Sequence, residues 1–176
     1  MNPRYLVLPG VGGSGPEHWQ TLWERCDTRF QRVQQRDWDN PVCSAWVSAL
    51  EGAVKASGPD VVLVAHSLGC LLAAHWAEET HLKIRAALLV AVPDPSGPNF
   101  PQQATGFFPL PQKKLPFQSL LVASSDDPYG SIDFAGRCSS VWGSTFKNVG
   151  AAGHINASSN LGEWSEGRRL LESLVA

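Results

Sequence analysis

Apolar residues in this chain occur in two kinds of stretch. Four short runs are almost continuously apolar, at positions 5–8, 61–64, 86–92 and 119–123. An unbroken run of Val, Leu and Ala residues predicts a strand that is buried on both faces, as in a parallel sheet. Helical spacing or a high content of helix-forming residues instead predicts helices over 17–26, 42–56, 68–80, 132–140 and 164–175.

Two further strands are predicted at 32–36 and 145–149. The first of them is more polar, which places it at or near an edge of the sheet. Strands then alternate with helices along the whole chain, a pattern typical of the α/β class. We therefore expect an α/β fold with about six parallel strands, right-handed crossovers and helices on both faces. Active sites in such sheets lie at the carboxyl ends of the strands.

Length and composition are those of one domain with few charges. The 176 residues suit a single domain over 1–176. A net charge of −2, with 17% charged residues, indicates neither a nucleic-acid partner nor an anionic membrane partner. The first apolar run is too short for a signal peptide, and no stretch reaches membrane-spanning length. Four well-separated cysteines are therefore expected to be reduced thiols of a cytoplasmic protein.

The residues around Ser67 have the form of a nucleophile elbow. The run at 61–64 leads directly into Ala65-His66-Ser67-Leu68-Gly69, and a helix is predicted to follow. A serine on such a sharp strand-to-helix turn projects its hydroxyl above the sheet, and small residues two positions before and after it permit the turn. Ala65 stands where glycine is usual. The alternative is a serine that only caps the helix, since serine is a favoured N-cap residue.

A glycine-rich loop at 9–16 follows the first strand, which is expected beside the elbow strand. Exposed N–H groups of such a loop can complete an oxyanion hole together with the N–H of Leu68. Val11 or Gly12 is the expected second donor, and the sequence favours neither. The loop also fits a dinucleotide-binding fingerprint loosely, with Asp37 as the acidic residue, but it lacks Gly-Lys-Ser/Thr.

Ser67, Asp127 and His154 each follow a predicted strand, so the topology brings them to one edge of the sheet. A serine hydroxyl is a weak nucleophile until a base takes its proton, which histidine can do. A carboxylate then fixes the tautomer of the imidazole. The order Ser, Asp, His is that of α/β-hydrolase triads. Asp126 remains an alternative acid, and Asp94 a weaker one.

The other histidines fit a catalytic base less well. His66 is fixed beside the serine and is expected to pack or to form hydrogen bonds. His75 and His81 fall on or at the end of the elbow helix, where structural or surface roles are expected. His18 opens the helix after the glycine loop, so it either lines the pocket or forms a hydrogen bond at the helix start. No residue spacing typical of a metal site is present.

Several motifs together resemble one known family. They are LPG at 8–10, SGPEHWQ at 14–20, DW at 37–38, AHSLGC at 65–70, SSDDPY at 124–129 and GHIN at 153–156. In this combination the chain resembles the small bacterial serine hydrolases of the YdeN type, which are related to retinoblastoma-binding protein nine. The resemblance implies a compact α/β-hydrolase fold without a large cap domain. It also implies Ser67 as nucleophile, His154 as base and Asp127, the aspartate before a proline, as acid.

The expected function is acyl transfer to water from a small carboxylic ester, with amides as a second possibility and no cofactor or metal. The competing hypothesis is a ligand- or protein-binding module on a hydrolase scaffold, which could lose a triad member without penalty. The few residues between the elbow strand and the expected triad acid leave room for only a small lid, so compact acyl groups are expected. Aromatic residues of the proline-rich segment 93–116 either roof the pocket or cover apolar surface elsewhere. The residues predicted to line the pocket are His18, Trp19, Phe107 and Phe108.

Overall fold

The apolar runs of the sequence form the centre of a six-stranded, fully parallel sheet in the order β2-β1-β3-β4-β5-β6. The structure is a computed structural model, and it describes residues 3–176. Leu63 in the middle of the elbow strand pairs with Leu6 on one side and Ala87 on the other. The strands are β1 (Arg4–Leu8), β2 (Phe30–Arg32), β3 (Val61–His66), β4 (Ala86–Val90), β5 (Gln118–Ala123) and β6 (Thr145–Asn148).

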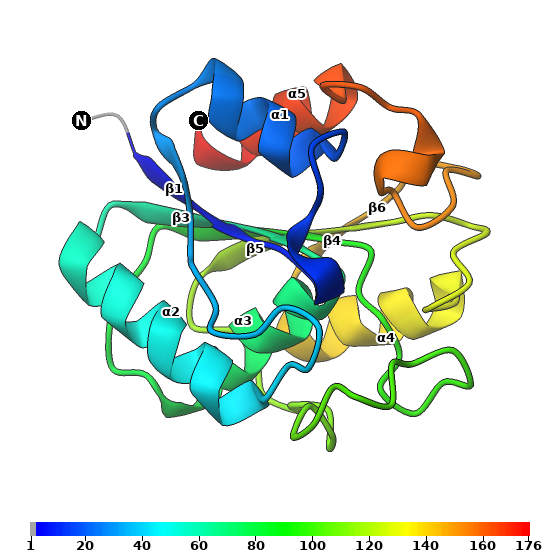
Figure 1. Ribbon diagram of the computed structural model, residues 1–176, viewed down its shortest axis with the longest axis horizontal. Coiled ribbons are helices and arrows are strands. Elements are labelled where there is room, and N and C mark those ends of the chain that lie inside the picture. Colours follow the sequence, from blue (N-terminus) through cyan, green and yellow to red (C-terminus); the bar gives the residue numbers. More distant parts are fainter. Residues whose placement is uncertain (1–2) are drawn as a thin grey trace.

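Helices cover both faces of this sheet, as expected for an α/β-hydrolase fold (Figure 1). On one face lie α1 (Trp19–Cys26) and α5 (Ser165–Val175). On the other lie α2 (Cys43–Ser57), α3 (Leu68–Glu79) and α4 (Ile132–Trp142). Two single-turn helices, η1 (Val11–Gly13) and η2 (Ala157–Ser159), follow β1 and β6. The predicted fold class is confirmed.

The sheet separates two apolar clusters, because successive side chains of a strand point to opposite faces. Along β3, Leu63 and Ala65 pack among residues of α2, α3 and α4, whereas Val62 and Val64 pack against α1 and α5. Every residue of β3 is buried. A strand that is buried on both faces needs apolar residues at every position, which is why the run at 61–64 is continuous.

The second strand begins earlier than predicted. It spans Phe30–Arg32 rather than 32–36, because the buried Phe30 ring stacks on Tyr5 of β1 with 4.3 Å between ring centres. The chain leaves the sheet after Arg32 and turns at Asp37, whose carboxylate accepts two backbone N–H groups. The edge position predicted for this strand is correct.

The proline-rich segment between β4 and β5 contains one isolated bridge, between Thr105 and Val42, and no helix or strand. It runs along the carboxyl edge of the sheet and then over the face covered by α2 and α3. No large cap domain is present among residues 3–176. In the same range, no helix combines the length and the apolar character needed to cross a bilayer.

Candidate active site

Ser67 occupies a strained turn between β3 and α3. Its backbone has φ 54° and ψ −123°, a combination that L-residues rarely adopt outside functional turns. The N–H of Ser67 donates to the carbonyl of Val90 in β4, which holds the turn against the sheet. A Cβ atom on Gly69 would lie 2.1 Å from the carbonyl oxygen of Leu8, so only glycine lets α3 approach β1 this closely.

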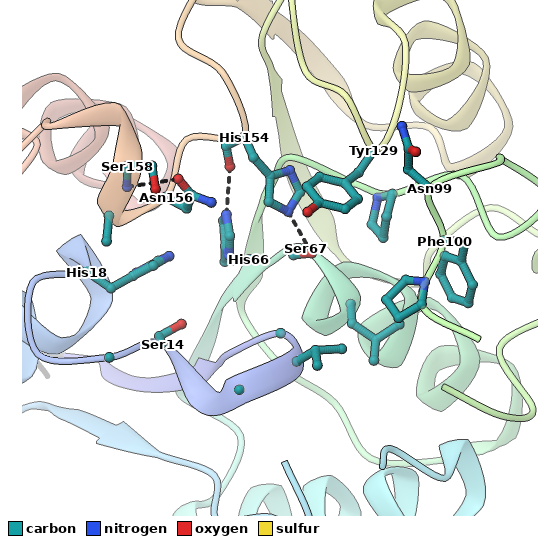
Figure 2. A pocket seen from close by; sticks show the side chains of 18 of the residues that line it. Ser14, His18, His66, Ser67, Asn99, Phe100, Tyr129, His154, Asn156 and Ser158 are labelled. Atoms are coloured by element: carbon teal, nitrogen blue, oxygen red, sulfur yellow. Dashed lines mark hydrogen bonds between the residues drawn. The ribbon is translucent and has the colours of Figure 1, made fainter. Parts of the chain in front are cut away.

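Three side chains form a continuous chain of hydrogen bonds at the carboxyl edge of the sheet. Figure 2 shows the bond of this chain that joins His154 and Ser67. His154 Nε2 lies 2.8 Å from Ser67 Oγ, and His154 Nδ1 lies 2.9 Å from each carboxylate oxygen of Asp127. With the Nδ1–H donating to the carboxylate, Nε2 is the unprotonated nitrogen and can accept a hydrogen bond from the Ser67 hydroxyl. The side chains of His154 and Asp127 are almost fully buried, at 9% and 2% exposed.

The loop that carries His154 is held by groups from two other elements. His66, on β3, donates its Nε2–H to the carbonyl of His154 at 2.8 Å. Trp19, on α1, donates its indole N–H to the carbonyl of Ile155, also at 2.8 Å. Burial lowers the pKa of His66 well below its usual value, so this ring is neutral beside the imidazole of His154. The role expected for His66, packing or hydrogen bonding, matches this position.

Asp126 supports the same loop in a different way. Its Oδ1 accepts from the Ser124 hydroxyl at 2.7 Å and from the N–H of Gly153 at 2.8 Å. These hydrogen bonds lower the pKa of Asp126, and the one from Ser124 has the largest effect. Asp94 accepts from the N–H of Ser96 and makes no hydrogen bond to His154. Of the three candidate acids, Asp127 alone contacts the imidazole within residues 3–176.

The glycine loop lies against the serine. A Cβ atom on Gly10 would come within 2.9 Å of Ser67 Cβ and 3.4 Å of the backbone nitrogen of Leu68. The N–H of Gly12 donates to the carbonyl of Trp38 at 2.9 Å, so it is already engaged. Val11 N–H therefore remains as the better candidate for the second oxyanion donor. Arg32 steadies the loop by donating to the carbonyls of Gly13 and Ser14.

A cavity of about 520 Å³ opens above Ser67. His154, His18 and residues from the proline-rich segment line it. The last group includes Gln103 and the Asn99 and Phe100 shown in Figure 2. Part of that segment therefore roofs the pocket, and its later part covers the core. Ser14, Tyr129, Asn156 and Ser158 also line the cavity, although they were not among the predicted pocket residues. Their loops have no periodicity that would have indicated this.

Three of the four residues predicted to line the pocket lie elsewhere. Trp19 is buried and packs edge-on against His66 and Trp23 and at a tilt against Trp164. Phe107 is 1% exposed and packs against Trp46, under the α2 face. Its neighbour Phe108 is 65% exposed and outside the cavity. Phe107 and Phe108 lie in an irregular segment, where side-chain directions follow a backbone path that no local sequence pattern predicts, whereas Trp19 begins α1 and packs inward. His18 does line the cavity.

No cluster of three or more His, Cys, Asp or Glu side chains within residues 3–176 is arranged to hold a metal ion. Asp37, the acidic residue of the loosely matched dinucleotide fingerprint, accepts hydrogen bonds from Asp39 and Asn40 within its own turn.

Comparison with known proteins agrees with this geometry. The family model described as serine hydrolase matches residues 5–173, almost the whole chain. The chain belongs to this serine hydrolase family. The hydrolase is 30% identical to a YdeN-like hydrolase from Pectobacterium atrosepticum, with a TM-score of 0.87 over 99% of this chain and 91% of the other. It is thus an esterase-like enzyme of the α/β-hydrolase superfamily, and the predicted resemblance is confirmed.

More distant structures share the fold of the hydrolase. The ydeN gene product from B. subtilis is 19% identical, with a TM-score of 0.81 over 98% of both chains. A monoacylglycerol lipase from Paleococcus ferrophilus is 13% identical, with a TM-score of 0.72 over 99% of this chain and 95% of the other. No curated protein matches the sequence significantly.

Proposed function

We propose that the enzyme hydrolyses small carboxylic esters by acyl transfer, with Ser67 as nucleophile, His154 as general base and Asp127 as its acidic partner. The observation that carries this proposal is the unbroken hydrogen-bond chain from Ser67 Oγ through the imidazole to both oxygens of Asp127. Such a chain lets the imidazole take the serine proton and return it to the leaving alcohol.

In the first step Ser67 Oγ attacks the ester carbonyl while His154 Nε2 accepts the hydroxyl proton. The carbonyl oxygen then carries a negative charge, which the N–H groups of Leu68 and Val11 stabilise. Leu68 opens α3, where the first N–H groups of a helix have no intrahelical acceptor. Removing one oxyanion donor from a serine hydrolase lowers kcat by on the order of 10²- to 10³-fold.

In the second step a water molecule takes the place of the departed alcohol. His154 removes a proton from this water, the hydroxide attacks the acyl carbon, and the proton passes to Ser67 as the acid is released. Asp127 keeps the imidazole in one tautomer throughout and stabilises the imidazolium that forms in each step. Asp126 has no contact with the imidazole, and its role is to hold the loop through Gly153.

Intact-mass analysis after treatment with a fluorophosphonate tests the assignment. Such a reagent phosphonylates a serine only where a base and an oxyanion hole already activate it. We expect one adduct on the wild type and none on Ser67→Ala, with Ser125→Ala as a matched control that still takes the label. The absence of an adduct on folded wild-type protein would overturn the proposal.

A further inference from the structure

The cavity above Ser67 has two sides. Asn99, Phe100 and Tyr129 lie on one side of the serine in Figure 2, and Ser14, His18 and Asn156 lie on the other. No Asp, Glu, Lys or Arg side chain is among the residues lining it. We call the group formed by Ser14, His18 and Asn156 the polar subsite. Its chemistry indicates what part of a substrate it would bind.

His18 supplies an unpaired hydrogen-bond donor to this subsite. Its Nδ1 accepts the N–H of Gln20 at 3.2 Å, so the hydrogen of the neutral ring is on Nε2. The side chain is 96% buried, and Nε2 has no hydrogen-bond partner among residues 3–176. Figure 2 shows the ring directed toward His66 and Asn156. Burial lowers the pKa of His18 to about 4, so the ring is neutral at pH 7.

The two other members of the polar subsite add a donor and an acceptor. Asn156 uses its Oδ1 to accept the N–H of Ser158 at 3.0 Å, which leaves its amide N–H groups without a partner among the described residues. Ser14 donates its hydroxyl hydrogen to Gln20 at 2.7 Å, so its oxygen is available only as an acceptor. The subsite thus offers donors from two side chains and an acceptor from the third.

We propose that the polar subsite binds a neutral hydroxyl group of the substrate, so that the enzyme prefers compact esters that carry a hydroxyl near the scissile bond. A hydroxyl can accept hydrogen bonds from His18 and Asn156 and donate one to Ser14. This inference rests on the proposed ester hydrolysis, because it assigns a substrate class to the same site.

Other groups fit the polar subsite less well. An alkyl group would leave the His18 donor unpaired, which is unfavourable because this nitrogen is buried and has no other partner among residues 3–176. A carboxylate would enter a cavity that no cationic side chain lines, and the nearby Arg32 guanidinium is engaged by Glu24 and the carbonyl of Gly13. A neutral oxygen that both accepts and donates matches all three side chains.

Two pairs of esters, in each of which a hydroxyl replaces a methyl group, test the inference. In the first pair the hydroxyl is in the alcohol part: 2-hydroxyethyl butanoate against propyl butanoate. In the second it is in the acyl part: methyl 3-hydroxybutanoate against methyl 3-methylbutanoate. Hydrolysis is followed by titration of the released acid, and the measured quantity is the ratio of kcat/KM within each pair. We expect kcat/KM to favour the hydroxyl ester by about tenfold or more in at least one of the two pairs, as in sites built to bind a substrate hydroxyl.

Two substitutions at the same position separate recognition from helix capping. His18→Asn retains a side-chain oxygen that can accept the N–H of Gln20, but it removes the donor at the position of Nε2. His18→Gln is longer and places an amide N–H near that position, but it is a poorer cap. We expect the preference to disappear in His18→Asn and to remain largely present in His18→Gln. The reverse order would show that His18 acts only through the helix start and would overturn the inference.

The wild-type enzyme distinguishes failure of this inference from failure of the proposed function. If it takes the fluorophosphonate label and cleaves the methyl-bearing esters at least as well as both hydroxyl esters, ester hydrolysis stands and the inference is wrong. If it takes no label and cleaves none of the four esters, the proposed function itself is wrong, and the hydroxyl preference falls with it.

Discussion

Asp126 and Asp127 are identical side chains at adjacent positions, yet they contact different parts of one loop. Asp127 accepts the Nδ1–H of His154, whereas Asp126 accepts the N–H of Gly153. Asp126 lies in the turn after β5 and Asp127 directly follows this turn, so neighbouring residues here reach different groups of the loop. The sequence left this pair unresolved, and only the resemblance to YdeN-type enzymes favoured Asp127.

This difference predicts unequal effects of the same substitution. An asparagine at position 127 can hold the imidazole in the wrong tautomer, so Asp127→Asn should lower kcat by on the order of 10⁴-fold, the effect known for the triad aspartate of another serine hydrolase. Asp126→Asn keeps an oxygen that can accept from Ser124 and Gly153, so its loss of kcat should be much smaller. Steady-state kinetics on one short ester measures both, and circular dichroism checks folding. Equal losses would contradict the assignment of Asp127 over Asp126.

The two buried, neutral histidines predict how stability depends on pH. The pKa of His18 is about 4 in the folded protein, and an unfolded chain has a histidine pKa near 6.5. Between these values the unfolded chain binds a proton that the folded protein does not, so stability falls as the pH falls from 6.5 to 4. The loss from His18 reaches about 3 kcal/mol at pH 4, and His66 acts in the same direction.

Urea unfolding at pH 7, 5.5 and 4 measures this dependence. We expect His18→Asn, which has no titrating group and keeps a capping oxygen, to lose less stability over this range than the wild type. Asp126, whose pKa is lowered, adds its own loss only at lower pH, where its carboxylate is protonated. Identical slopes for the wild type and His18→Asn between pH 6.5 and 4 would show that His18 is not buried in its neutral form.

At the scale of elements, the packing of α3 against β1 brings the elbow and the glycine loop together. Gly69 in the first turn of α3 faces the backbone of Leu8, and the chain continues from Leu8 directly into Gly10 and Val11. A side chain at position 69 would therefore push apart the two elements that supply the serine and the proposed oxyanion donors.

Gly69→Ala should consequently reduce both stability and labelling. Its Cβ would lie 2.1 Å from a backbone oxygen, so α3 or β1 has to move. Overpacking of this kind typically lowers the free energy of unfolding by about 1–3 kcal/mol. The matched control is Gly52→Ala within α2, where a Cβ meets no atom within 4 Å. Alanine should raise the free energy of unfolding there by about 0.5–1 kcal/mol. Urea midpoints and fluorophosphonate labelling rates measure both; unimpaired labelling of Gly69→Ala would contradict this account.

Elements that depend on local pattern were predictable from the sequence. Central strands such as β3 and β4 are buried on both faces, so their continuous apolar runs mark them directly. The predicted bounds of the polar edge strand β2 were wrong. Only Phe30 among its residues is buried, and a single apolar residue gives no periodic pattern from which a strand can be located.

Contacts between segments distant in the sequence were not predictable. His66 and Trp19 hold consecutive carbonyls of the loop after β6, although they are far from it in the chain. No local sequence pattern predicts these contacts, because they depend on where α1 and β3 lie relative to β6. For the same reason the sequence could identify His18 as a pocket candidate but also included Phe107 and Phe108, whose directions the backbone path alone determines.

At the scale of the whole molecule, residues 3–176 of the hydrolase are built on a single sheet. Both apolar clusters share its strands, and the edge where the strands end carries the cavity. Residues 93–103 of the irregular segment, rather than a separate cap, form one wall of it, through Pro93, Phe100 and Pro101. We therefore expect the size of the substrate to be limited by this short piece of chain, which β4 precedes and the packed Phe107 follows.

A cavity of about 520 Å³ predicts a limit on the length of the acyl group. If the cavity continued as an apolar channel, each further buried CH₂ would add about 0.8 kcal/mol and kcat/KM would keep rising with chain length. We expect instead a maximum between acetate and hexanoate in a series of p-nitrophenyl esters, and little activity on the dodecanoate. Initial rates below the critical micelle concentration measure this profile. Phe108→Ser should leave it unchanged, because Phe108 is 65% exposed and outside the cavity. Cleavage of the dodecanoate without cleavage of the short esters would show that the proline-rich segment opens as a lid.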